Sequence, residues 1–100
     1  MTDTNTIVKP MINTKLKQPN LYNVIYVNDD ATTMEFVVES LRSVFNHTQE
    51  RAHQITQEVH EEGSSIVATL QFELAEQKGL EVQTMARNQG YPLVVKVEEE

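Results

Sequence analysis

The sequence alternates short runs of β-branched and aromatic residues with longer stretches whose apolar residues recur every three or four positions. The short runs cover 21–27, 65–70 and 93–97, and each has the length and composition of a single β-strand. The longer stretches include 34–45 and 72–89, where the apolar spacing is that of one face of a helix. The order β-α-α-β-α-β predicts an α+β fold, in which a three-stranded antiparallel sheet packs on three helices as a two-layer sandwich.

Capping residues predict where the helices begin and end. Thr32 and Glu35 fit a capping box, with Thr32 as the N-cap of the first helix. Thr48 is expected to cap a second helix, and Gly63 is a natural residue to end it. Gly79 lies inside the third predicted helix, where glycine costs about 1 kcal/mol relative to alanine. We therefore expect close packing or a partner contact at Gly79.

Residues 1–19 differ in composition from the rest of the chain. They are polar, are interrupted by Pro10 and Pro19, and are predicted to form a flexible, disordered N-terminal tail ahead of a folded domain at 20–100. The tail is either a plain solvated leader or a segment that docks transiently on a partner. The apolar residues available for docking are Ile7, Val8, Met11, Ile12 and Leu16.

Charge is also divided between these two parts of the 100-residue chain. Residues 1–19 contain three lysines and one aspartate, a net charge of +2. Residues 20–100 contain 5 basic and 14 acidic side chains, a net charge of −9. Because nucleic-acid binding requires positive charge facing the phosphates, the predicted domain is unsuited to it. Cationic groups or basic surfaces are the expected partners, with solubility as the simpler explanation of the charge.

Cysteine and long apolar segments are both absent from the sequence. The lack of cysteine excludes disulfides, cysteine-based zinc sites and thiol nucleophiles, and it fits a reducing compartment. No stretch approaches 18 consecutive apolar residues, and the N-terminus lacks the apolar core of a secretory signal. We therefore expect a cytoplasmic protein that has no transmembrane helix.

Three consecutive side chains with acceptor oxygens lie between the first strand and the first helix. Asn28, Asp29 and Asp30 suit a cation, either a metal ion or an ammonium group, but such residues also form the turns that lead into helices. His60, near the end of the second helix, is either a ligand-binding imidazole or a cation that complements the helix C-terminus. The residues alone leave both pairs of alternatives open.

Metal-binding and catalytic motifs are missing. A zinc site needs three or four closely spaced ligands, H-E-x-x-H is absent, and His53 and His60 are too far apart to share one metal. His47 is expected to be solvated. The P-loop, Rossmann and G-x-S-x-G signatures are absent as well. We expect no metal, no cofactor and no catalysis; the weakest alternative is a small metal-dependent enzyme that uses Asp29, Asp30 and His60.

Four motifs, taken together, resemble the ClpS family, the adaptors of the bacterial ATP-dependent Clp protease with its ClpA unfoldase. They are N-D-D-x-T-x-M-E-F-V from Asn28, V-H at 59–60, E-L-A-E-Q-K at 73–78 and Y-P-L at 91–93, within about residues 20–97. The resemblance implies a monomeric, non-enzymatic adaptor that binds N-degrons, proteins with N-terminal Leu, Phe, Tyr or Trp. It further implies delivery of these proteins to ClpA for degradation by ClpP, with the N-terminal tail taking part.

The same resemblance assigns residues of this chain to two binding surfaces. Asn28, Asp29 and His60 would hold the α-amino group of the bound N-terminus, which carries one charge and three donors. Glu73 and Lys78 match family positions that contact the N-terminal domain of ClpA. The pocket for the side chain of the bound N-terminal residue would be lined by Thr32, Met34, Val37, Thr56, Val59 and Leu93, with Asp30 at its rim.

Three residues depart from the family pattern. Ala31 replaces an aromatic residue, Thr33 replaces a proline, and Thr56 stands where the pocket usually has methionine. We expect Thr56 to enlarge the pocket and make it more polar, which shifts the preference toward larger or more polar aromatic residues and away from Leu. Met34 is retained, so Ile and Val should still be rejected. The alternative is a generic interaction domain that binds the unfoldase but has lost or altered N-degron binding.

Overall fold

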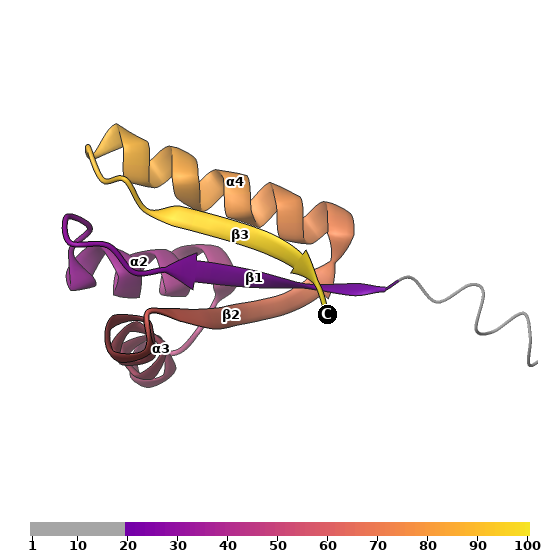
Figure 1. Ribbon diagram of the computed structural model, residues 1–100, viewed down its shortest axis with the longest axis horizontal. Coiled ribbons are helices and arrows are strands. Elements are labelled where there is room, and N and C mark those ends of the chain that lie inside the picture. Colours follow the sequence, from indigo (N-terminus) through magenta and orange to yellow (C-terminus); the bar gives the residue numbers. More distant parts are fainter. Residues whose placement is uncertain (1–19) are drawn as a thin grey trace, which may run out of the picture.

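The computed structural model describes residues 20–100 as an open sheet with helices packed against it (Figure 1). The tail predicted at 1–19 lies outside the described residues. The predicted element order and α+β class are confirmed. The elements are β1 (Leu21–Val27), α2 (Met34–Phe45), α3 (Gln49–Glu62), β2 (Ser64–Gln71), α4 (Phe72–Asn88) and β3 (Val94–Glu99).

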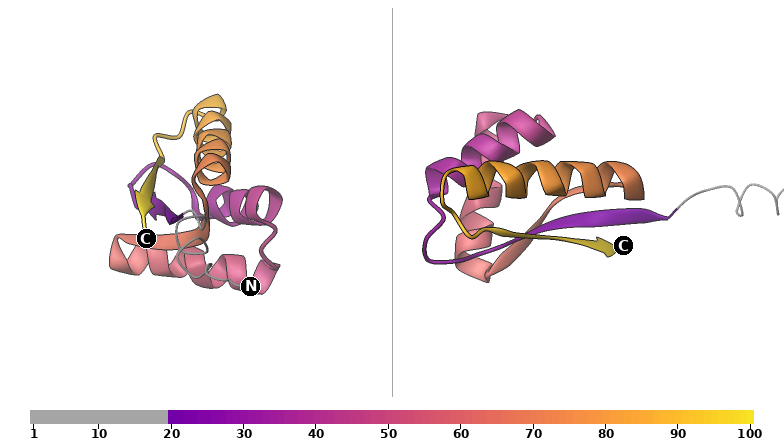
Figure 2. Two further views of the ribbon diagram at one scale, coloured as in Figure 1. Left: turned by 90° about the vertical axis from the view of Figure 1, so that its right-hand side faces the viewer. Right: turned by 90° about the horizontal axis from the view of Figure 1, so that it is seen from above.

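The sheet has the strand order β2-β1-β3, and both neighbouring pairs are antiparallel. Figure 2 shows α2 and α4 on one face of the sheet, and α3 packs against α2 and β2. A register shift between Val24 and Ile25 leaves Val67 of β2 as an extra, buried residue. The Val67 carbonyl oxygen lies 2.7 Å from Nε2 of His47. His47 is thus half-buried and hydrogen-bonded, contrary to the solvated position expected for it.

The alternation along β1 places Val24 and Tyr26 in the core, where both side chains are fully buried. The Tyr26 hydroxyl lies 2.7 Å from Oγ of Ser40, and Ser40 donates to the carbonyl oxygen of Val37 at 2.9 Å. Burial raises the pKa of the Tyr26 phenol, and the hydrogen bond to Ser40 opposes only part of that rise. Because an unpaired buried hydroxyl costs about 1–3 kcal/mol, this polar chain fixes the position of α2 on the sheet.

The first helix is capped one residue later than predicted. Thr33 is its N-cap, since Oγ1 of Thr33 accepts a hydrogen bond from the Phe36 amide at 3.1 Å. The Thr32 hydroxyl is instead held at the loop by its hydrogen bond to Oδ2 of Asp29. The predicted capping box of Thr32 and Glu35 is therefore wrong.

The predicted limits of α3 are confirmed, and those of the last strand need correction. Thr48 caps α3 by accepting a hydrogen bond from the amide three residues later, and Gly63 ends the helix with a φ of 92° in the left-handed region. The last strand begins at Val94 rather than Leu93 and continues to Glu99, because the whole of this segment pairs with β1. Leu93 is instead a core residue just before the strand.

Gly79 lies in α4 opposite β3, and a Cβ atom there would sit 3.5 Å from a methyl carbon of Val95 and 3.5 Å from one of Val97. These are ordinary contact distances, so the packing accepts alanine at this position. Because alanine also has the higher helix propensity, we expect Gly79→Ala to raise the free energy of unfolding by about 0.5–1 kcal/mol. Urea denaturation measures this change.

Gly63→Ala provides the opposing control for this experiment. The φ of Gly63 lies in the left-handed region, where a Cβ atom costs about 1–2 kcal/mol. The same glycine-to-alanine change should therefore lower the free energy of unfolding at Gly63 and raise it at Gly79. A loss of stability in Gly79→Ala would show that the helix cannot accommodate the added methyl group.

Candidate functional site

Four chain segments meet at one end of the molecule, where β1 and α3 end, α2 begins and α4 leads into β3 (Figure 1). The Asn28 amide donates to the carbonyl oxygen of Gly63 at 2.9 Å, which ties the end of β1 to the C-terminal turn of α3. Asn28 and Asp29 therefore lie beside the turn that carries His60. The structure thus brings the three predicted ammonium-binding residues to one end of the fold, with Asn28 and His60 exposed and Asp29 half-buried.

The Asp29 carboxylate is held in place by the loop that follows it. Its Oδ1 accepts hydrogen bonds from the amides of Ala31 at 2.8 Å and Thr32 at 2.7 Å, and its Oδ2 accepts one from the Thr32 hydroxyl at 2.8 Å. Partial burial acts to raise the pKa of Asp29, but these hydrogen bonds and the positive charge of Arg87 outweigh it and lower the pKa. Asp29 is therefore a fixed anion at neutral pH.

The turn interpretation of Asp29 is correct, and it does not exclude a role in cation binding. The three hydrogen bonds occupy three of about four acceptor positions of a carboxylate, so one position on Oδ2 and the negative charge are left over. The C-terminal carbonyl groups of α3 add partial negative charge nearby. Asn28 Oδ1 and a neutral His60 nitrogen are further acceptors of the kind that an ammonium group needs.

A groove of about 720 Å³ lies between the start of α2 and α3. It is lined by two of the residues predicted for the side-chain pocket, Met34 and Thr56, which are 41% and 4% exposed. Thr56 is one helical turn from His60, so the groove is next to the proposed ammonium site. Sequence reasoning did not select the other residues that line the groove, which are Thr33, Glu35, Val38, Glu39, Gln49, His53 and Gln57.

The remaining predicted pocket residues do not line this groove. Val37, Val59 and Leu93 belong to the hydrophobic core, and each is less than one-tenth exposed. Thr32 is half-buried and is hydrogen-bonded to Asp29, while Asp30 is exposed. The place of these five residues in a ligand pocket stays a prediction.

Thr56 uses its hydroxyl within its own helix. Oγ1 of Thr56 donates to the carbonyl oxygen of Ala52 at 2.7 Å, so its proton is not available to a ligand. The Thr56 oxygen can still accept a hydrogen bond, but it has no proton free to donate. The expectation of a larger and more polar pocket stays a prediction.

The two residues expected to contact an unfoldase lie on different faces of α4. Nζ of Lys78 donates to the carbonyl oxygen of Val44 at 2.8 Å, which joins α4 to the C-terminal end of α2. Glu73 is exposed and lines a separate groove beside β3. Lys78 therefore has a structural contact that its sequence position did not reveal.

Arg87 of α4 also belongs to the end of the fold that holds Asp29. It donates to the carbonyl oxygens of Tyr91 at 2.9 Å and Leu93 at 3.0 Å, and its charge favours the ionised form of Asp29. The Tyr91 ring packs on Phe36 of α2 with 5.3 Å between centroids. Arg87 thus holds the connection between α4 and β3 in place. Arg87 and Asp29 are far apart in sequence, so no local sequence pattern predicts that the charge of Arg87 acts on Asp29.

Within residues 20–100, no helix is both long and apolar enough to cross a membrane. Within the same residues, no three side chains of His, Asp or Glu come together as they would around a metal ion.

Comparisons with known proteins agree with the sequence motifs. Residues 17–96 match the family model described as ATP-dependent Clp protease adaptor protein ClpS. The ClpS adapter protein of Campylobacter jejuni (strain RM1221) is 44% identical over 87 residues, which are 87% of this chain and 91% of that protein. That of Acetivibrio thermocellus is 41% identical over 95 residues, covering 95% and 96% of the two chains.

A solved structure is similar as well. Agrobacterium tumefaciens ClpS2 bound to L-phenylalaninamide superimposes with a TM-score of 0.81 at 32% identity, covering 83% of this chain and all of that one. The fold, the family model and these relatives lead to one conclusion. The chain belongs to the ClpS family of ATP-dependent Clp protease adaptors.

Proposed function

We propose that this adaptor binds the free N-terminal residue of proteins that begin with Phe, Tyr, Trp or Leu and delivers them to the ClpA unfoldase for degradation by ClpP. The observation that carries the proposal is the fixed Asp29 carboxylate next to the C-terminal turn of α3. The ligand of the Agrobacterium relative supports it, because L-phenylalaninamide has a free α-amino group, an aromatic side chain and an uncharged amide. These are the features of the first residue of a peptide.

Simple energetics agree with recognition of one residue. An aromatic side chain buries about 150–250 Å², which at about 25 cal/mol per Å² corresponds to roughly 4–6 kcal/mol before the costs of binding. Alanine would forfeit most of this free energy. A dissociation constant near 1 μM corresponds to about −8 kcal/mol, which is within reach of one aromatic side chain plus a charged hydrogen-bonded α-amino group. Such an affinity also permits release to the unfoldase.

The experiment that tests binding compares peptides that differ only in the first residue. Fluorescence anisotropy should show micromolar binding of Phe, Tyr and Trp peptides, weak or no binding of Ile and Ala peptides, and loss of binding of acetyl-Phe. Acetylation removes the charge and most of the donors while leaving the aromatic ring unchanged. Equal binding of Phe and acetyl-Phe would reject N-terminal recognition and favour a generic interaction domain that has lost it.

Asp29 is expected to hold the ammonium group equally well between about pH 8 and about pH 5.5, because its pKa lies below the ordinary value of 3.8 and its carboxylate stays ionised over the range. His60 is tested by substitution: because its imidazole is proposed to accept a hydrogen bond from the ammonium group, His60→Ala should weaken binding of the Phe peptide. Fluorescence anisotropy measures both effects. Unchanged affinity of His60→Ala would remove His60 from the site.

Delivery is the second half of the proposal. Glu73, which is exposed on α4, contacts the N-terminal domain of ClpA in this proposal, and Lys78 supports the same helix through its hydrogen bond to Val44. The adaptor itself performs no catalysis in this proposal. Its cytoplasmic location and monomeric state stay predictions.

A further inference from the structure

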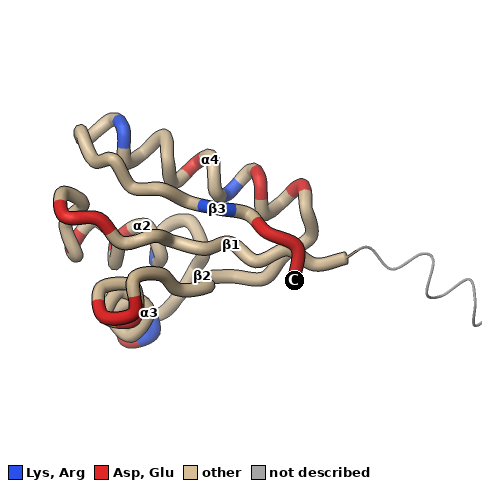
Figure 3. The backbone as a smooth tube through the Cα atoms, viewed as in Figure 1, with Lys and Arg blue, Asp and Glu red and all other residues tan. Residues whose placement is uncertain are grey.

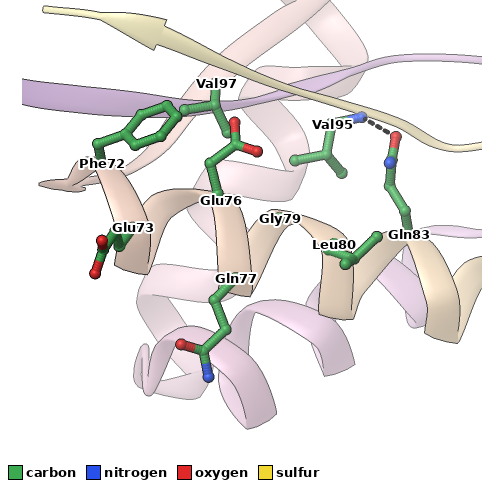
Figure 4. A pocket seen from close by; sticks show the side chains of 9 residues that line it. All are labelled: Phe72, Glu73, Glu76, Gln77, Gly79, Leu80, Gln83, Val95 and Val97. Carbon is green, nitrogen blue, oxygen red and sulfur yellow. Dashed lines mark hydrogen bonds between the residues drawn. The ribbon is translucent and has the colours of Figure 1, made fainter.

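A second groove, of about 600 Å³, runs along α4 and β3 and shares no residue with the groove between α2 and α3 (Figure 4). Gly79 has no side chain, so Val95 and Val97 of β3 form part of its wall. Phe72 and Leu80 line its α4 side and are 49% and 65% exposed. The described residues thus leave apolar surface uncovered here, next to an edge strand of the sheet.

The two ends of this groove differ in chemistry. At one end, Oε1 of Gln83 accepts a hydrogen bond from the Val95 amide at 3.1 Å, which satisfies the edge of β3 at that point (Figure 4). At the other end, Glu73 and Glu76 lie on the first two turns of α4, and β3 leads into the acidic residues 98–100. Figure 3 shows acidic residues at the start of α4 and at the end of β3. The groove is therefore apolar along its length and negative at the end where α4 begins.

The described chain begins at this negative end. The Tyr22 ring packs on Phe72, which lines the groove, with 4.9 Å between centroids. The side chain of Asn20 donates a hydrogen bond to Glu99 at the end of β3. Nineteen residues precede Asn20, and at about 3.3 Å per residue they can extend to about 60 Å, more than the roughly 25 Å length of α4. The preceding segment can therefore reach every part of the groove.

That segment has the complementary composition. Residues 11–17 read Met-Ile-Asn-Thr-Lys-Leu-Lys and combine three apolar side chains with two lysines, between Pro10 and Pro19. We propose that residues 11–17 dock in the groove between α4 and β3 of the same chain. Their apolar side chains cover the exposed residues of α4, and their lysines lie beside Glu73 and Glu76.

If the proposed function holds, docking of residues 11–17 competes with binding of the unfoldase. Because the groove includes Glu73, the docked segment covers the surface that we assign to the unfoldase. Residues 11–17 and the unfoldase therefore cannot both occupy the surface around Glu73. Displacement of the segment by the unfoldase would free residues 11–17 at the moment of delivery.

The docking itself is tested on the full chain by NMR. The sequence has no cysteine, so Thr14→Cys places a single nitroxide label in the segment. Broadening of amide signals should be strongest at 79–83 and 95–97, and weakest at Ile66 on the opposite edge strand. Glu76→Lys should reduce the docked fraction by about two- to fivefold, the size of one surface ion pair. Glu61→Lys, the same charge change on α3, should leave it unchanged.

Each alternative occupant gives a distinct pattern. Broadening that is strongest at the groove between α2 and α3, or absent beyond the start of β1, overturns the proposal. Equal effects of Glu76→Lys and Glu61→Lys overturn it too, because they indicate a general attraction between opposite charges. Mixing labelled chain with an isotope-enriched, unlabelled chain tests for a second copy: broadening in the enriched chain shows that the segment docks on another molecule. None of these measurements depends on N-degron binding, so failure of the proposed function is detected separately.

Discussion

Replacing Asp29 by asparagine is expected to weaken binding of a peptide with a free aromatic N-terminus by about 10- to 30-fold. A hydrogen bond to a charged group contributes about 1.5–3 kcal/mol, and each 1.4 kcal/mol changes affinity tenfold. The lower part of this range applies because Asp29 is only half-buried and water screens its charge. Fluorescence anisotropy with a Phe peptide measures the change.

Asparagine is the appropriate replacement because it preserves the loop. Its side-chain oxygen can keep the two hydrogen bonds from the amides of Ala31 and Thr32 that Oδ1 of Asp29 accepts. Its NH₂ group takes the place of Oδ2 and can donate to the Thr32 hydroxyl, which reverses that hydrogen bond without breaking it. The substitution therefore removes the negative charge and leaves the path from β1 to α2 intact.

Glu81→Gln is the matched control for this experiment. Glu81 lies on α4, loses one negative charge in the same way and is exposed, so its substitution should alter affinity by less than about threefold. The free energy of unfolding of Asp29→Asn should stay close to that of the parent chain. An unchanged affinity of Asp29→Asn, or equal losses in both variants, would show that Asp29 acts only as the turn residue of its loop.

Local signals in the sequence were sufficient for most of the fold. The first strand, the cap at Thr48 and the stop at Gly63 depend on neighbouring residues, and the structure confirms them. The error at the start of α2 has the same origin, because Thr32 and Thr33 are both acceptable N-caps. The structure selects Thr33 since Asp29 engages Thr32. A capping rule that considers each threonine separately cannot detect that another side chain, here Asp29, already holds one of them in the loop.

The candidate site was only partly predictable for a related reason. The turn at Asp29 is local, but its neighbourhood is assembled by the hydrogen bond from Asn28 to Gly63 and by the charge of Arg87. Lys78 reaches Val44 across a helix pair in the same way. Both grooves also form between elements, so the residues that line them come from separate parts of the chain. Sequence periodicity identifies the buried side of each element, but not which exposed residues meet.

Thr56→Met is expected to shift the preference between Leu and Tyr peptides about tenfold toward Leu. Thr56 is 4% exposed, lines the groove of about 720 Å³ with Met34, and sits one helical turn from His60. Methionine adds volume where the parent chain leaves room for a large ring. Changes of one or two methylene groups in such a pocket alter discrimination by about 10- to 200-fold. The ratio of the two dissociation constants, measured by anisotropy, is the relevant quantity because it cancels changes in overall affinity.

The shift depends on size rather than polarity. The Thr56 hydroxyl already donates to Ala52, so Thr56→Val, which keeps the width but removes the hydroxyl, should leave the ratio of Leu to Tyr binding nearly unchanged. Thr84→Met makes the same change as Thr56→Met at an exposed position of α4 and should leave the ratio unchanged as well. If Thr56→Met also leaves the ratio unchanged, the side chain of the bound residue does not enter the groove between α2 and α3. Recognition would then rest on the α-amino group at Asp29.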